Sequence, residues 1–139
     1  MKTQLSLVAA ITLMVITVSV HAHHPFAAEY DWTKPVTLTG TVSKLEWTNP
    51  HAMLYIDGKD DSGQMKHWTL EMGGIAALTR AGWTRTTLKM GDEVTVMAWM
   101  SKTKPDKANA KSVILPDGRE LSAASSIADV TPSKTPVSN

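Results

Sequence analysis

An alternating stretch that changes phase at residues 43–44 constrains the fold of this chain more than any other feature. Before this point, small or apolar residues recur at every second position, the spacing that places side chains on one face of a β-strand. They are Val36, Leu38, Gly40 and Val42. Beyond it, the apolar residues Leu45 and Trp47 have the opposite parity. A strand changes faces in this way only through a bulge or a sharp bend, so we expect a long, bent first strand.

Four further β-rich runs and one short helical pattern follow the bent strand. The runs are residues 51–57, 64–72, 93–100 and 109–115, and the helical pattern covers residues 75–80 before Gly82. The order strand, strand, strand, helix, strand, strand is that of a small five-stranded Greek-key barrel of the OB type. We therefore predict a mainly β fold of this OB-like kind, with one short helix between strands 3 and 4. A small open β-sandwich is the alternative architecture.

The first 22 residues have the features of a secretory signal peptide. A nearly unbroken apolar run covers residues 5–20 after Lys2, and Val20-x-Ala22 is a small-residue cleavage site. The run is shorter than the ~20 residues that span a bilayer, although a retained anchor stays an alternative. Cleavage after Ala22 predicts an exported chain, periplasmic or secreted, with no stable membrane anchor.

The mature chain would contain 139 minus 22 residues, or 117, enough for one domain with its own core. We expect an extended N-terminal arm over residues 23–34, an OB-like barrel over residues 35–121 and a disordered tail over residues 122–139. Loss of Lys2 leaves 13 basic against 13 acidic residues. This neutral balance argues against partners such as nucleic acid or an anionic membrane surface.

The residue types present also limit the chemistry. The chain has no cysteine, which excludes disulfides, zinc–thiolate sites and thiol catalysis. It contains no nucleophile elbow, phosphate-binding glycine loop, His-Glu-x-x-His motif or dinucleotide fingerprint. We therefore expect a protein that is not an enzyme.

Histidine at the processed terminus is the main functional signal. After cleavage, His23 offers its free α-amine and its ring Nδ1, which together chelate a metal ion, and His24 follows it. A third nitrogen from elsewhere completes a tetragonal set suited to Cu(II), an arrangement that resembles the histidine brace of copper proteins. We expect His51 to supply that nitrogen. A cleavage point one residue away would abolish the chelate and leave a soluble, flexible start.

The second and third runs are expected to form a hairpin that brings further ligands to His51. Alternation puts the aliphatic residues of both runs on the core face and the histidines on the outer face. We expect Asp57 to pair near Met65, as the polar turn permits. The opposed pairs on the outer face are then His51 with Glu71 and Tyr55 with His67. Such pairs have Cβ atoms ~5 Å apart, close enough for two ligands or a ligand and its supporting carboxylate.

Each of these side chains has an alternative structural role. His51 follows Asn49-Pro50 and can stabilise that turn through a hydrogen bond. His67 can be an ordinary surface residue of its strand. Glu71 can accept hydrogen bonds from the amides of residues 73–74.

Two function classes lead, ahead of a third, a periplasmic enzyme, for which the sequence shows no recognisable nucleophile or acid–base pair. The first is an exported metal-binding protein, with copper as the favoured metal, that uses His23 and His51, completed or supported by His24, His67 or Glu71. The second is a non-catalytic binding module whose barrel face, or a surface of Trp47, Trp83 and Trp99, engages a periplasmic protein, a glycan or a small ligand.

Three motifs resemble those of a family of small exported bacterial proteins of unknown function. They are residues 23–31 (HHPFAAEYD), residues 46–51 (EWTNPH) and residues 82–94 (GWTRTTLKMGDEV). That family has an HHxFAAEYD mature N-terminus and a W-x-N-P-H motif, and the resemblance extends over most of residues 23–121. Pro25 stands where many members have serine. Membership implies export and a small β-barrel, but it brings no established activity.

The cleavage site is the first testable point. Mass spectrometry of the exported protein is expected to show a chain that begins at His23. A mature chain with any other first residue would remove the amine and imidazole chelate.

Overall fold

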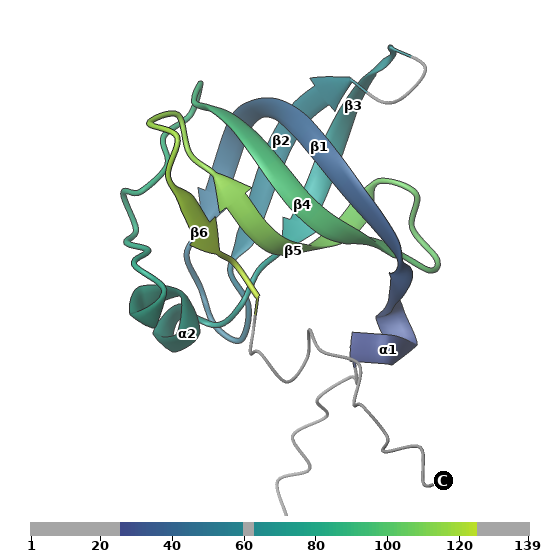
Figure 1. Ribbon diagram of the computed structural model, residues 1–139, viewed down its shortest axis with the longest axis horizontal. Coiled ribbons are helices and arrows are strands. Elements are labelled where there is room, and N and C mark those ends of the chain that lie inside the picture. Colours follow the sequence, from purple (N-terminus) through teal and green to yellow (C-terminus); the bar gives the residue numbers. More distant parts are fainter. Residues whose placement is uncertain (1–25, 60–62, 125–139) are drawn as a thin grey trace, which may run out of the picture.

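Strands form most of the ordered chain in the computed structural model, which describes residues 26–59 and 63–124 (Figure 1). The elements are α1 (Phe26–Glu29), β1 (Tyr30–Glu46), β2 (Met53–Lys59), β3 (Met65–Glu71), α2 (Ile75–Arg80), β4 (Glu93–Ser101), β5 (Lys107–Ile114) and β6 (Glu120–Ser122). None of the helices in these ranges has the length and hydrophobicity needed to span a bilayer.

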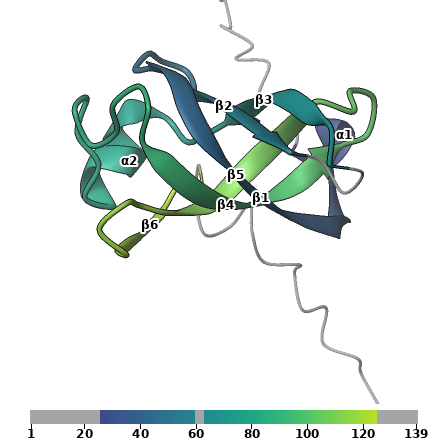
Figure 2. The same cartoon turned by 90° about the horizontal axis from the view of Figure 1, so that it is seen from above.

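Five of the strands close into a ring. The order of all six strands in the sheet is β3-β2-β1-β4-β5-β6, and a parallel pairing of β3 with β5 closes the ring, which leaves β6 at its edge (Figures 1 and 2). Leu70 of β3 lies opposite Ala108 of β5 at this closure. The mainly β, OB-like prediction is confirmed, including the helix between the third and fourth strands.

The bend in β1 is where the sequence predicts it. Along the β1–β2 pair, Val42 faces Ile56 and Lys44 faces Tyr55, so Ser43 is an extra residue in β1. β1 pairs with β4 through residues 30–41 and with β2 through residues 40–46, and the bulge brings Leu45 to the same face as Val42.

The aliphatic faces of the hairpin build the core, as their alternation predicts. Six apolar side chains on these faces are buried: Ala52, Leu54, Ile56, Trp68, Leu70 and Met72. They pack with residues of the other strands in one cluster. The opposite face of β2 and β3 therefore carries most of the polar side chains of the hairpin, together with Met53 and Met65.

The prediction that Trp47, Trp83 and Trp99 form a binding surface is wrong. Trp83 and Trp99 are buried, and Trp47 packs partly buried against the core. The Trp83 indole also donates a hydrogen bond to the carbonyl of Ser122, at 2.8 Å. These large rings contribute more as packing than as an exposed platform. The exposed indole among the described residues is that of Trp32.

Residues 26–34 of the expected arm and residues 122–123 of the expected tail are part of the fold. Residues 26–29 form a helical turn and residues 30–34 already belong to β1, so the described part of the arm is not a loose extension. At the other end, Ser122 closes β6 and Ala123 is buried, with its amide donating to Lys111 and its carbonyl accepting from Gly73. Tertiary hydrogen bonds thus order segments whose composition is typical of loops. The expected signal peptide, His23, His24 and residues 125–139 lie outside the described residues.

Gly40 permits the close approach of β1 and β2. It pairs with Gly58, and a Cβ atom at Gly40 would lie 2.6 Å from the carbonyl oxygen of Asp57. Both the glycine and this oxygen belong to paired backbone, so neither moves without disturbing the ladder.

The variant Gly40→Ala is expected to lower the free energy of unfolding by about 1–3 kcal/mol, the usual cost of overpacking. Urea unfolding followed by tryptophan fluorescence measures this. The exposed Thr37→Ala on the same strand is the control and should change stability by less than about 0.5 kcal/mol. Equal stability of Gly40→Ala and the wild type would contradict the close approach.

Candidate functional site

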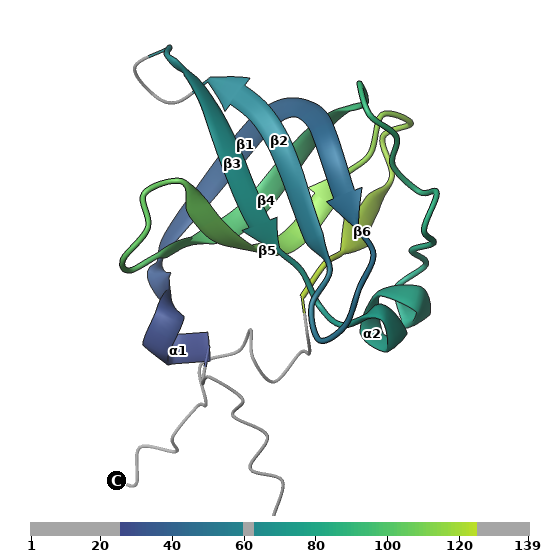
Figure 3. The same ribbon diagram turned by 180° about the vertical axis from the view of Figure 1, so that it is seen from behind.

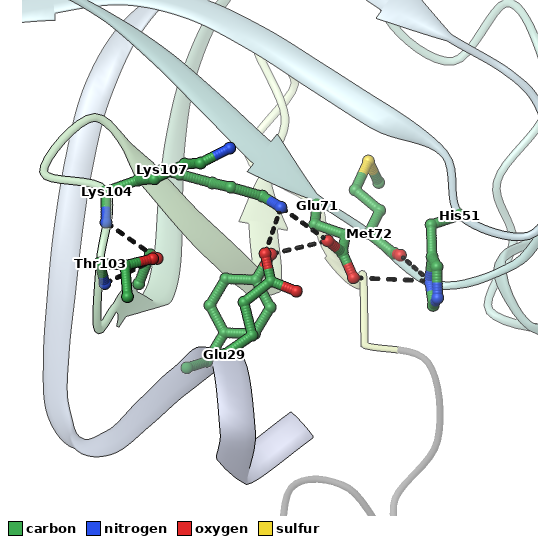
Figure 4. Close-up of polar contacts among 9 residues, drawn as sticks. Glu29, His51, Glu71, Met72, Thr103, Lys104 and Lys107 are labelled. Carbon is green, nitrogen blue, oxygen red and sulfur yellow. Dashed lines mark hydrogen bonds and ion pairs between the residues drawn. The ribbon is translucent and has the colours of Figure 1, made fainter. Parts of the chain in front are cut away.

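A polar network joins three separate parts of the chain at one end of the ring (Figure 4). The Lys107 ammonium lies 2.6 Å from Glu29 Oε1 and 3.2 Å from Glu71 Oε2. The Tyr30 hydroxyl donates to the same Glu71 oxygen at 2.6 Å. Both α1 and α2 lie at this end, opposite the β2–β3 turn (Figures 1 and 3).

The strand closure brings Glu71 and Lys107 together. Glu71 is the last residue of β3 and Lys107 is the first residue of β5. The last three residues of β3 pair in parallel with the first three residues of β5. Glu71 stands on the polar face of β3, since its neighbours Leu70 and Met72 point into the core.

The short helix α1 is held against this end by backbone and ring contacts. The amide of Lys102 donates to the carbonyl of Glu29 at 2.9 Å. The Phe26 ring packs against Tyr30 and edge-on against Trp99, with centroids 5.4 and 5.5 Å apart. These contacts position the Glu29 carboxylate toward Lys107.

Tyr30 is buried and stays protonated over a wide pH range. Burial and the hydrogen bond to Glu71 raise the pKa of its phenol well above the ordinary value, because both disfavour a second negative charge beside the carboxylate. Tyr30 therefore acts as a hydrogen-bond donor to Glu71.

Lys107 stays charged in this environment. Burial alone lowers the pKa of its ammonium, but hydrogen bonds to Glu29 and Glu71 outweigh that effect and the net pKa is raised. The ammonium also lies 5.5 Å from the centre of the Tyr30 ring. The network thus contains a permanent positive charge between two carboxylates.

His51 is oriented by this network. Its Nδ1 lies 3.0 Å from the carbonyl oxygen of Met72 and 3.8 Å from Glu71 Oε1. A carbonyl only accepts hydrogen bonds, so Nδ1 carries the proton and donates it. In the neutral ring, Nε2 then holds the free electron pair, and it makes no hydrogen bond to a described residue. The side chain is 38% exposed, which leaves it open to a ligand.

The hairpin register differs from the expected one by two residues. Asp57 pairs with His67, not Met65, and Glu71 pairs with Met53 instead of His51. The strands extend through Gly58 and Lys59, because glycine at position 58 accommodates the crossing with β1. A shift of two preserves the face of every side chain. His51 therefore still reaches Glu71, as a diagonal neighbour.

His67 is not brought to His51. Its Nδ1 pairs with Asp57 Oδ1 at 2.5 Å, and its side chain is 91% exposed. It stands four positions from Glu71 along β3, about 13 Å at the rise of a strand. Within residues 26–59 and 63–124, no three His, Cys, Asp or Glu side chains are grouped so that they could hold a metal ion.

Sequence reasoning missed Glu29, Tyr30 and Lys107 as members of this network. Glu29 and Tyr30 are part of the FAAEYD segment, which attracted attention only as a motif. Lys107 carries no local signal, because its role depends on the pairing of β3 with β5.

A model described as Family of unknown function (DUF6152) matches residues 10–109. The chain belongs to this family. Comparison with curated proteins and with solved structures found no match.

The DUF6152 match covers every member of the network, from Glu29 on α1 to Lys107 on β5. The family carries no activity that could be transferred to this chain. Functional inference therefore depends on the chemistry of the residues themselves.

Alkaline titration tests the environment of Tyr30. The chain has two tyrosines, and the pKa of Tyr55 is also raised, by burial and its hydrogen bond to Glu46. In the folded protein both tyrosines have pKa values above the ordinary 10.0. Their contribution to the free energy of unfolding is therefore fully present below pH 10 and is lost as the pH rises above it. We expect tyrosinate absorbance to appear together with unfolding.

The variant Tyr30→Phe is the comparison. Its free energy of unfolding should fall less steeply with pH above 10 than that of the wild type, because one shifted group is gone. Tyrosines that ionise near pH 10 in the folded protein would contradict this environment.

Proposed function

We propose that this is an exported metal-binding protein, with copper as its metal. The ligands are the α-amine and ring of His23 and the Nε2 atom of His51. His24 and Glu71 support or complete the site. Its location is the periplasm, reached through cleavage after Ala22.

The orientation of His51 carries this proposal. Histidine ligands in metalloproteins almost always donate their second ring N–H to a carbonyl or a carboxylate. His51 has such a partner, since its Nδ1 donates to the Met72 carbonyl at 3.0 Å, while a Glu71 oxygen lies 3.8 Å away, beyond hydrogen-bond distance. This contact fixes the tautomer that presents Nε2 as a ligand.

The position of α1 supports the contribution of His23. Phe26, the first residue of α1, follows His23 by three positions and packs against Tyr30 and Trp99. Figures 1 and 3 show α1 below the strands, at the same end of the ring as the network. Three residues span up to about 10 Å, so His23 is tethered by a short segment to this end of the ring.

The donor set favours copper over other metals. Two imidazole nitrogens and one amine suit the tetragonal geometry of Cu(II), and the chain has no cysteine for a thiolate site. Glu71 lies 3.8 Å from His51 Nδ1, where its negative charge favours a cation bound at Nε2. Such a site is suited to buffering or delivery of the metal.

Copper titration of the mature protein tests the proposal. Wild type is expected to bind one Cu(II) with nitrogen couplings in its EPR spectrum, and His23→Ala and His51→Ala should each weaken binding by about 100-fold or more. His67→Ala is the matched control, because His67 is an exposed histidine of the same hairpin. Its affinity should equal that of the wild type.

Two results would contradict copper binding at this site. One is equal affinity of the wild type and His51→Ala. The other is a protein whose spectra and stability do not respond to Cu(II), which would favour the non-catalytic binding module instead.

A further inference from the structure

Lys107 occupies the position of a bound cation. Its ammonium lies within 3.2 Å of an oxygen from each of two carboxylates, Glu29 and Glu71. The Tyr30 oxygen is 2.6 Å from the nearer Glu71 oxygen. The side chains of Lys107 and Glu71 are only 16% and 15% exposed. Two carboxylates, one of which accepts a hydrogen bond from Tyr30, thus contact one positive charge.

Without the ammonium, the same oxygens would be donors for a hard divalent cation. Carboxylate oxygens are the ligands that Ca²⁺, Mg²⁺ and Mn²⁺ prefer. Two carboxylates without Lys107 would leave a charge of −2 in a partly buried location, which attracts a counter-ion. With Lys107 present, the three charged groups sum to −1 and the space between the carboxylates is filled.

We propose that Lys107 determines the metal selectivity of this end of the ring, by standing between Glu29 and Glu71 and excluding oxygen-ligated divalent cations. The nitrogen of His51 is thereby left as the available ligand, which selects for metals that accept imidazole. This inference rests on the proposed metal-binding function, because selectivity has meaning only at a site that binds a metal.

Two features hold Lys107 in this role. Its hydrogen bonds keep the ammonium charged, and the raised pKa agrees with that. The Tyr30 ring lies beside the ammonium, with its centre 5.5 Å away. A divalent cation from solution must therefore displace the Lys107 ammonium, which already contacts both carboxylates.

Titration with Mn²⁺ tests this selectivity, read out by paramagnetic broadening of NMR signals from the full mature protein. In the wild type, millimolar Mn²⁺ should not selectively broaden the signals of Glu29, Tyr30 and Glu71. Lys107→Met and Lys107→Gln remove the charge and should bind Mn²⁺ there at least about tenfold more tightly, with Kd near ~10⁻⁴–10⁻³ M. Lys107→Arg retains the charge and should resemble the wild type.

Either of two outcomes overturns the role of Lys107. One is selective broadening of these signals in the wild type, which is decisive whether or not the variants fold. The other is a folded, neutral variant with no gain in Mn²⁺ affinity over Lys107→Arg.

A Cu(II) titration of the wild type separates this inference from the function on which it rests. Millimolar Mn²⁺ should leave Cu(II) affinity unchanged. Competition by Mn²⁺ would overturn the selectivity alone, whereas absence of Cu(II) binding in the Mn²⁺-free wild type would overturn the proposed function.

Discussion

The bulge in β1 is the constraint on which the rest of the structure depends. One extra residue, Ser43, brings Leu45 to the same core-facing side of β1 as Val42. Without the bulge, the apolar residues before and after Ser43 would lie on opposite faces of the sheet. The bend turns the sheet so that β3 meets β5 and the ring closes.

Ring closure builds the polar network as well as the core. The pairing of β3 with β5 places Glu71 beside Lys107, two residues that are 36 positions apart in the chain. α1 then adds Glu29 from a third region, and Tyr30 at the start of β1 completes the hydrogen bonding. The core side of these strands is apolar, so their charged side chains gather where the strands end. This end of the ring therefore combines fixed charge with partial exposure.

The charge of Lys107 and the tautomer of His51 together determine which metal ligands this end of the ring offers. A permanent ammonium neutralises one of two carboxylates, while Glu71 also faces a histidine whose Nδ1 is committed to a carbonyl. Oxygen ligands are thus engaged within the protein, and an imidazole nitrogen is directed outward. That division matches the proposed preference for a nitrogen-ligated metal in a chain without cysteine.

The sequence by itself determined the parts of this protein that depend on local periodicity. Alternation and its change of phase predicted the bent first strand, the buried aliphatic faces of β2 and β3, and the element order of an OB-like ring. The outward faces of His51 and Glu71 followed from the same period of two. Only the tertiary structure decided the hairpin register, the order of residues 26–34, the burial of Trp83 and Trp99, and the place of Lys107. These features depend on contacts between distant segments, and such contacts leave no periodic pattern along the chain.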